Sequence, residues 1–258
     1  MTEILVIAFF SFIASGLTLF SGFGLGTLLM PIVAIFFPIQ LAIAITAIVH
    51  LLNNFFKFLL LGKFASKKVV LKFGIPAIIA AIIGAFCLTF LNIFPPIFNG
   101  KIFSIKVEIL PINLIIGLLI LLFTFIESSK RFSEMKISQK YLPLGGFLSG
   151  FFGGLSGHQG AFRSIFLLKS NLSKEEFVGT NIIISMFVDI TRMSIYGFVI
   201  FNSKLNIDYF VVSVATIFAF LGAYVGSRFL EKITINTIQK IVSIFLVIIS
   251  IGLIFGFF

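Results

Sequence analysis

The chain has 258 residues, of which 59% are hydrophobic and 11% are charged, and its mean hydropathy is +1.21. This composition excludes an ordinary soluble domain and indicates an integral protein of the lipid bilayer. The formal net charge of +10 does not indicate nucleic acid as a partner, because Lys and Arg stand between apolar segments and form no continuous basic stripe. With a single cysteine, Cys87, the chain offers neither a disulfide framework nor a cysteine metal cluster.

Eight apolar segments follow one another along the chain. They lie at roughly 4–37, 39–61, 69–91, 110–127, 141–169, 177–201, 207–230 and 235–258. About 20 residues of helix span the hydrocarbon core of a bilayer, so most segments are predicted to cross it once. Glycine clusters interrupt the first and fifth segments, which are therefore predicted to form two helices each, joined by a turn. The fold class is thus an all-α integral membrane protein with about eight helical segments.

Two helix starts have local signals. Pro38 suits the first helical position of the second segment. Ser173 and Glu176 have the spacing of a capping box before the sixth segment.

The chain contains an internal repeat. Residues 12–26 read FIASGLTLFSGFGLG and residues 147–161 read FLSGFFGGLSGHQGA, at an offset of 135. Further matches are Asn54 with Asp189, Lys57 with Arg192, Gly62 with Gly197 and, at a slightly different offset, Gly84-Ala85 with Gly222-Ala223. The predicted parts are a first transmembrane repeat at 1–127, a basic cytoplasmic linker at 128–140 and a second transmembrane repeat at 141–258. Transporters often place a substrate site between two such repeats.

Positive charges distinguish two topologies, because cytoplasmic loops collect Lys and Arg. If all eight segments cross, the loop charges divide almost evenly between the two sides. If the first and fifth segments are re-entrant hairpins, all loop charges except Lys101, Lys106 and Lys204 gather on one side. The stronger segregation favours hairpins, with repeats of inverted topology and both termini outside. Full crossing by the hairpin arms stays an alternative.

Three cationic residues, Lys57, Arg163 and Arg192, lie inside apolar segments, where an ionised side chain costs about 2.5 to 3.5 kcal/mol on insertion scales. Arg192 has Asp189 three residues earlier on the same helical face. Lys57 is near the end of its segment, from which its side chain can extend to the membrane surface. Pairing and anchoring therefore compete with a functional role for each cation.

Two segments carry polar stripes with helical spacing, which are predicted to face inward because a polar face on a membrane helix must meet protein or water. The stripes are Thr46, His50, Asn54 and Lys57 in the second segment, and Asn181, Ser185, Asp189, Arg192 and Tyr196 in the sixth. Interhelical hydrogen bonding without a substrate is the alternative for Asn181 and Ser185. The residues assigned to pairing or coupling are His50, Asn54, Lys57 and Asp189. Either His50 or His158 could couple transport to protons, and hydrogen bonding alone is the alternative.

The two helix breaks are predicted to bind an anion. Each leaves backbone N–H groups at the start of the following helix, where the helix dipole is positive. Glycine allows the turn and the close approach of a ligand, and Arg163 adds charge about one turn after the second break. The predicted substrate-binding residues are Ser21, Gly22, Gly24, Ser156, Gly157, His158, Gln159, Gly160, Arg163, Asn181 and Arg192. Close helix packing through glycine is the competing explanation.

An enzyme is not expected from these residues. Asp189 is the only acidic residue well inside an apolar segment, and the chain shows no carboxylate pair, metal cluster, phosphate loop or nucleophile motif. No catalytic residue, metal or cofactor is therefore predicted.

SGFGLGTLLMPI at 21–32, GFLSGFFGGLSGHQGAFRSIFL at 146–167 and the GTN of 179–181 resemble the sulfite exporter TauE/SafE family. The resemblance covers nearly the whole chain, and GGLSGxxG in the second half is its more specific part. It implies a plasma-membrane permease built from two repeats that moves small anions such as sulfite or organosulfur acids. The family's glycine-rich segments correspond to Ser21–Gly26 and Ser156–Gly160 in this chain.

The sequence therefore predicts a secondary, alternating-access permease for a small anion, with sulfite or a sulfonate as the expected cargo and proton coupling as an option. An anion-selective channel and a non-transporting membrane protein that binds a partner or assists assembly are the alternatives. Saturable flux with counterflow would favour the carrier. The direction of transport, the coupling ion and the oligomeric state, a homo-oligomer included, stay open.

Overall fold

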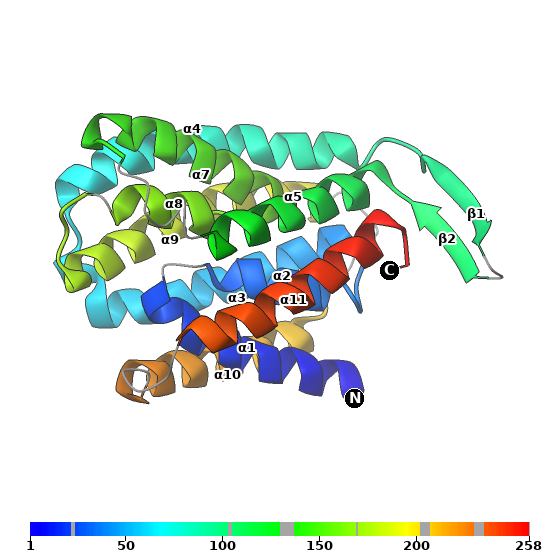
Figure 1. Cartoon of the computed structure of the whole chain (residues 1–258), viewed down its shortest axis with the longest axis horizontal. Helices are drawn as coiled ribbons and strands as arrows, with labels where there is room; N and C mark the ends of the chain where they lie inside the picture. Colours follow the sequence, from blue (N-terminus) through cyan, green and yellow to red (C-terminus); the bar gives the residue numbers. More distant parts are fainter. Residues whose placement is uncertain are drawn as a thin grey trace.

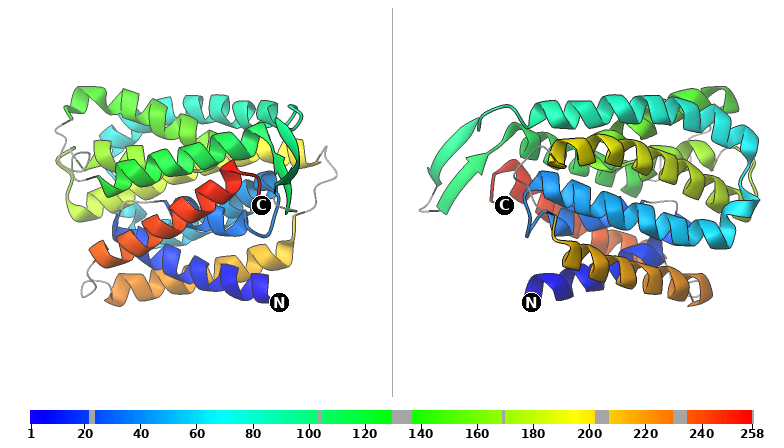
Figure 2. Two further views of the ribbon diagram at one scale, coloured as in Figure 1. Left: turned by 45° about the vertical axis from the view of Figure 1, so that its right-hand side comes forward. Right: turned by 180° about the vertical axis from the view of Figure 1, so that it is seen from behind.

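The computed structural model describes all residues except 22–23, 103–104, 130–136, 169, 202–206, 230–234 and 258. The described part is a bundle of helices with one projecting β-hairpin (Figures 1 and 2). In chain order the elements are α1 (Thr2–Ser21), α2 (Leu25–Val33), α3 (Ile39–Leu61), η1 (Gly62–Phe64), α4 (Lys67–Leu91), β1 (Phe98–Ile102), β2 (Ile105–Ile109), α5 (Pro111–Ser128), η2 (Gln139–Tyr141), α7 (Leu142–Ser156), α8 (Gly160–Leu167), α9 (Lys174–Phe201), α10 (Tyr209–Phe229) and α11 (Ile235–Ile254). The predicted helical membrane fold is confirmed.

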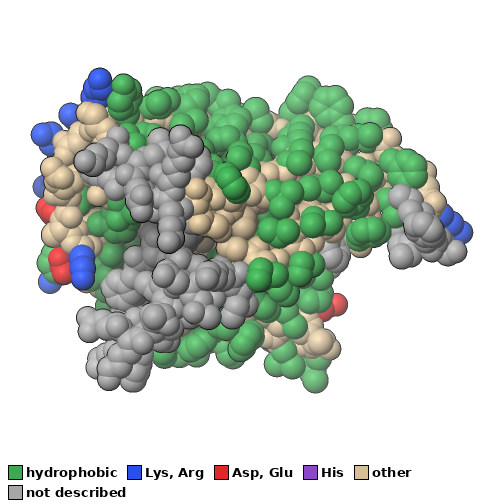
Figure 3. Space-filling model, in the orientation of Figure 1, with side chains coloured by type: hydrophobic (Ala, Val, Ile, Leu, Met, Phe, Trp, Pro, Cys, Tyr) green, Lys and Arg blue, Asp and Glu red, His purple; other side chains and the backbone are tan. Residues whose placement is uncertain are grey.

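Four helical stretches in the described part are long and apolar enough to cross a membrane. They are Ile39–Phe64, Lys67–Leu91, Lys174–Phe198 and Tyr209–Gly226. Shorter apolar helices lie at Thr2–Thr18, Pro111–Ile126 and Ser243–Ile254. The outer surface between the two ends of the bundle is broadly apolar, as Figure 3 shows for one face. Such a belt is suited to contact with lipid.

The two glycine-rich segments break into separate helices, as predicted. The first forms α1 and α2, and the second forms α7 and α8. Gly157 follows α7 with φ +80°, a left-handed conformation that favours glycine, and its N–H donates to the carbonyl of Gly153 at 3.0 Å. The local sequence therefore ends α7 by a glycine C-cap.

The capping box before α9 is confirmed. The Ser173 N–H donates to Glu176 Oε2 at 2.9 Å, and the Glu176 N–H donates to Ser173 Oγ at 3.1 Å. Pro38 lies one residue earlier than predicted, at the N-cap of α3.

The hairpin of β1 and β2 is not among the elements predicted from the sequence. The strands pair antiparallel, with Phe98 opposite Ile109 and Ile102 opposite Ile105. The alternation of Ile105, Val107 and Ile109 was the signal that could have indicated a strand.

Corresponding helices of the two halves pack in corresponding ways. The first helix of each half lies on the other half, since α1 packs against α10 and α7 packs against α4. The pairs α3 with α9 and α5 with α11 join each helix to its own counterpart. This reciprocal packing supports the predicted duplication. The division at 1–127, 128–140 and 141–258 stays a prediction, and residues 130–136 of the linker lie outside the described part.

Glycine brings α7 into backbone contact with α4. A Cβ atom on Gly146, Gly150 or Gly154 would lie 2.1, 2.0 or 2.2 Å from the carbonyl oxygen of Phe73, Ala77 or Ala81, respectively. Two further glycines allow close packing between the two halves. A Cβ on Gly84 of α4 would lie 2.0 Å from the carbonyl oxygen of Phe151 in α7, and a Cβ on Gly222 of α10 would lie 2.0 Å from the carbonyl oxygen of Phe12 in α1. These glycines therefore serve close helix packing.

Gly150→Ala is expected to destabilise the fold, because the added Cβ would force α7 away from Ala77 of α4. Overpacking of this kind typically costs about 1–3 kcal/mol. Gly197→Ala in α9 is the matched control, since a Cβ there meets nothing within 4 Å. The measurement is the thermal unfolding midpoint of each purified variant in detergent. Equal midpoints for the two variants would contradict the close contact between α4 and α7.

The second hairpin, α7 and α8, begins and ends at one end of the bundle. Gln139 Nε2 before α7 donates to the carbonyl of Ser170 after α8 at 3.1 Å. The connection between α3 and α4 lies at this end too, where the Ser66 N–H donates to Thr180 Oγ1 at 2.9 Å. Both chain termini lie toward the opposite end, near the β-hairpin (Figures 1 and 2). This arrangement supports the re-entrant interpretation of the fifth segment, while the side of the membrane on which each end lies stays a prediction.

Candidate functional site

The two glycine-rich breaks meet in the middle of the bundle. A Cβ on Gly26 would lie 3.2 Å from the carbonyl oxygen of Gly157, and one on Gly24 would lie 3.9 Å from the backbone nitrogen of Gly160. The Gly24 position also faces Thr27 Oγ1 at 3.7 Å and His50 Nε2 at 3.8 Å. The amino ends of α2 and α8 therefore converge next to the middle of α3.

Two hydroxyl groups beside this convergence are buried and have no hydrogen-bond partner among the described atoms. They are Oγ1 of Thr27 in α2 and Oγ1 of Thr46 in α3. A buried hydroxyl without a partner costs about 1–3 kcal/mol, so such groups suit a polar ligand that completes their hydrogen bonds.

The two polar stripes face inward, as predicted, because every predicted member is buried. The members are Thr46, His50, Asn54 and Lys57 in α3, and Asn181, Ser185, Asp189, Arg192 and Tyr196 in α9. The contact between α3 and α9 brings the two stripes together. Asn54 and Asp189, which correspond in the internal repeat, touch one another at 3.4 Å.

Asp189 is the centre of the buried polar network. Its Oδ1 accepts hydrogen bonds from Gln159 Nε2 and Arg192 Nε, both at 3.0 Å. Its Oδ2 lies 2.7 Å from His50 Nδ1 and accepts a hydrogen bond from Asn54 Nδ2. The carboxylate therefore links α3, α9 and the turn before α8, and the predicted pairing of Asp189 with Arg192 is present at 2.8 Å.

Arg163 in α8 is almost fully buried but has neutral partners. Its Nε donates to Asn181 Oδ1, and its Nη1 donates to Gln159 Oε1 at 2.8 Å. No carboxylate contacts this guanidinium directly in the described part of the chain. Its charge is therefore oriented by hydrogen bonds without being cancelled by an adjacent anion.

Lys57 in α3 is 4% exposed, which contradicts the alternative that its side chain extends to the membrane surface. Its Nζ donates to the carbonyl of Ser15 in α1 at 3.4 Å. Asn53 provides a second acceptor at 3.2 Å when its amide oxygen is turned toward the ammonium. The contact of α3 with α1 turns this side chain inward, which the position of Lys57 along the segment did not reveal.

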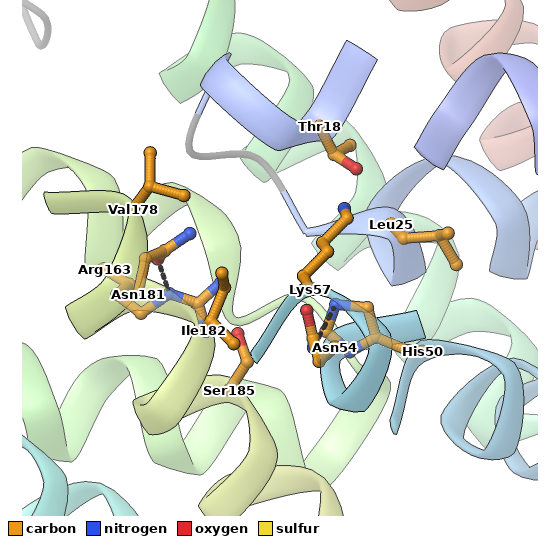
Figure 4. A pocket seen from close by; sticks show the side chains of 10 residues that line it. All are labelled: Thr18, Leu25, His50, Asn54, Lys57, Arg163, Val178, Asn181, Ile182 and Ser185. Atoms are coloured by element: carbon orange, nitrogen blue, oxygen red, sulfur yellow. Dashed lines mark hydrogen bonds between the residues drawn. The ribbon is translucent and has the colours of Figure 1, made fainter. Parts of the chain in front are cut away.

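A cavity lies beside this network (Figure 4). Its lining residues are Thr18, Leu25, His50, Asn54, Lys57, Arg163, Val178, Asn181, Ile182 and Ser185. Figure 4 shows Lys57 extending from α3 toward Thr18 of α1, with Arg163 and Asn181 joined on another side. The volume of the cavity, counted as the space that the centre of a water molecule can occupy, is about 10 Å³. This is close to the minimum for one water molecule.

The cavity includes only some of the predicted binding residues. Arg163 and Asn181 line it, together with His50, Asn54 and Lys57, which were assigned to pairing or coupling. Gly22 lies outside the described residues, as does the side chain of Ser21. Gly24, Gly157 and Gly160 border the convergence of the helix ends. Gln159 contacts the lining residue Arg163 directly, and Arg192 reaches the lining residues through Asp189.

Ser156 and His158 lie outside the cavity lining and contact residues of α7 and α5. Ser156 Oγ donates to the carbonyl of Phe152, and His158 Nδ1 lies 3.1 Å from the Ser156 carbonyl oxygen. The His158 ring stacks on Phe123 of α5 with a centroid distance of 5.4 Å. Neither residue is among those that line the cavity.

Sequence reasoning missed four lining residues: Thr18, Leu25, Val178 and Ile182. Val178, Ile182 and Ser185 continue the helical spacing of the predicted stripe around Asn181, which could have indicated two of the four. Leu25 joins the site because α2 packs against α3, and Thr18 joins it because α1 lies at hydrogen-bond distance from α3 through Ser15.

The sequence model of the family described as Sulfite exporter TauE/SafE matches residues 7–253. A search of curated proteins found no significant match. The matched region contains both glycine-rich breaks, the buried polar network and every residue that lines the cavity. Members of this family are transporters, and membership implies membrane transport of sulfur-containing anions. The chain is therefore a multi-pass membrane protein that belongs to the sulfite exporter TauE/SafE family.

Proposed function

We propose that the protein is a secondary transporter of a small oxyanion, with sulfite or a sulfonate as its cargo, and that the anion binds between Lys57 and Arg163. The observation that carries the proposal is a buried excess of positive charge. The buried formal charges of the described residues are Lys57, Arg163 and Arg192 against Asp189, which leaves an excess of two. Buried charge is costly without a counter-charge, so an anion with one or two negative charges suits this region.

The lining groups suit an oxyanion in particular. Arg163 offers a planar set of N–H donors and Lys57 a compact ammonium, and charge-assisted hydrogen bonds to oxyanions are among the strongest in proteins. Amide and hydroxyl groups of Thr18, Asn181 and Ser185 add further donors around the cavity. The amino ends of α2 and α8 contribute positive dipoles at the convergence beside it.

The other lining residues, Leu25, Val178 and Ile182, are apolar and form the remaining wall. An apolar wall lowers the local dielectric and strengthens each charged contact with a bound anion. In this proposal, the polar groups bind the oxygens of the anion and the apolar wall faces the sulfur of sulfite or the carbon substituent of a sulfonate.

The small volume of the cavity favours a carrier over the alternative of an anion channel. A channel requires a continuous pore, whereas about 10 Å³ admits little more than one water molecule. The proposed transporter therefore opens its site by moving helices, and the hairpins formed by α1 with α2 and by α7 with α8 are the elements that bring the helix ends to the anion.

The test is uptake of labelled sulfite into proteoliposomes that contain the purified protein, with unlabelled sulfite, sulfate, thiosulfate and a sulfonate as competitors. Saturable uptake above protein-free liposomes is expected, with competition by the anion that fits the site. Counterflow, in which internal unlabelled anion accelerates entry of label, is expected of a carrier and not of a channel. Folded protein that gives neither uptake nor counterflow with any of these anions would contradict the proposal.

A further inference from the structure

His50 connects the cavity to the buried carboxylate. Its Nδ1 lies 2.7 Å from Asp189 Oδ2, while the ring also lines the cavity. Its Nε2 faces the convergence of the helix ends, 3.8 Å from the Cβ position of Gly24, a point that also has the Gly160 nitrogen at 3.9 Å. One ring nitrogen is therefore held by Asp189, while the other lies 3.3 Å from Asn54 Nδ2 and faces the convergence beside the site proposed for the anion.

We propose that His50 carries a proton together with the anion, so that each transport cycle moves one proton in the same direction as its cargo. This inference rests on the proposed function of the cavity as an anion site. It assigns the coupling ion and the residue that binds it, which the proposed function leaves open.

The contact with Asp189 decides what protonation does to the ring. The 2.7 Å separation is a hydrogen bond in which Nδ1–H donates to the carboxylate, so Nε2 carries the lone pair of the neutral imidazole. In the neutral ring this lone pair accepts from Asn54 Nδ2 at 3.3 Å, so His50 offers no donor to an anion. When a proton adds to Nε2, an N–H bond forms there, the Nδ1–H bond is kept, Asn54 Nδ2 keeps only its hydrogen bond to Asp189, and the ring presents a donor.

The charges around His50 make the proton and the anion depend on each other. The groups that face it are Asp189 and Arg192 from α9, Arg163 from α8 and Lys57 from its own helix, α3. Protonation would raise the buried excess of two positive charges to three unless an anion enters. An anion in turn gains one more donor from the protonated ring. Each ligand thus increases the affinity of the site for the other by the same factor.

His158 provides a matched control because it is a second buried histidine outside this arrangement. Its Nδ1 faces the carbonyl and hydroxyl oxygens of Ser156 at 3.1 Å, and its ring stacks on Phe123. No carboxylate contacts it in the described part of the chain. His158→Gln therefore makes the same chemical change as His50→Gln without touching Asp189 or the cavity.

The experiment uses proteoliposomes with labelled sulfite and a membrane potential clamped at zero. Two rates are measured for each protein: accumulation driven by an inward proton gradient, and counterflow without a gradient. With one proton per anion, a gradient of one pH unit supports about a tenfold concentration ratio of anion. Protein-free liposomes correct for passive entry of undissociated acid.

The wild type and His158→Gln are expected to show both proton-driven accumulation and counterflow. His50→Gln, which keeps a hydrogen-bonding amide but cannot carry the proton, is expected to retain counterflow and to lose the accumulation. His50→Asn is a second variant for the same comparison if His50→Gln does not fold.

Accumulation in a folded His50 variant equal to that of the wild type would overturn the inference. So would a wild type that shows counterflow but no response to the proton gradient, and this outcome does not depend on the folding of any variant. Absence of counterflow from the wild type with every anion would contradict the proposed function itself.

Discussion

Arg163→Ala is expected to lower the flux of labelled anion by about ten- to a hundredfold, and at least as much as Lys57→Ala. Arg163 is 1% exposed, lines the cavity and has only neutral partners in the described structure. A hydrogen bond to a charged group contributes about 1.5–3 kcal/mol, and each 1.4 kcal/mol corresponds to a tenfold change in affinity. The alanine variant removes this contact together with one of the two cations that line the cavity.

The measurement is the initial rate of uptake in proteoliposomes reconstituted with equal amounts of folded variant. Arg163→Lys keeps the charge but loses the planar set of donors, so an intermediate rate is expected. Lys101→Ala on the β-hairpin is the matched control, because it removes an exposed cation outside the cavity. Uptake equal to that of the wild type in folded Arg163→Ala would contradict the site as described.

Asp189→Ala is expected to have the largest effect on stability. The fully buried carboxylate contacts Gln159, Arg192, His50 and Asn54, which come from α3, α9 and the turn before α8. Removing one partner of a buried ion pair typically costs about 3–5 kcal/mol, because the remaining charge is left without compensation. We therefore expect a lower unfolding midpoint in detergent and a smaller monodisperse fraction.

The double variant Asp189→Ala with Arg192→Ala is expected to recover part of the lost stability, because it also removes the Arg192 guanidinium that the single variant leaves without its carboxylate partner. Glu175→Ala at the start of α9 is the control for loss of one carboxylate, since Glu175 is exposed and such surface substitutions usually change stability by less than about 0.5 kcal/mol. An unfolding midpoint of Asp189→Ala like that of Glu175→Ala would show that the network does not stabilise the fold. A double variant less stable than Asp189→Ala would show that Arg192 stabilises the fold without its carboxylate partner.

The helices of this protein could be predicted from the sequence because their signals are local. Each of the eight apolar segments forms one helix or one broken pair, since apolar length and composition specify a membrane helix. The glycine clusters predicted the breaks, and Ser173 with Glu176 predicted the start of α9. The inward orientation of both polar stripes also followed from sequence, because a membrane leaves a polar helix face no other environment than protein or water.

The composition of the site was less predictable. The sequence placed the anion at the two glycine-rich breaks, whereas the cavity lies beside them, between α1, α2, α3, α8 and α9. Some glycines near the second break serve the packing of α7 on α4, which a glycine pattern alone does not separate from a ligand site. Arg163 could be identified from its charge, but the neutral partners that leave this charge uncancelled are contributed by Gln159 and Asn181.

The sequence by itself determined the membrane environment, the helical segments, the two breaks and the charged residues buried within the segments. The tertiary structure alone decided which of these residues meet, because α1 and α7 each pack on the opposite half and the two stripes join across α3 and α9. Thr18 and Leu25 enter the cavity, and Lys57 turns inward to Ser15, through contacts between segments that are far apart in the chain. Apolar length and helical period are properties of a local stretch of chain, whereas a binding cavity depends on which helix faces are placed against one another.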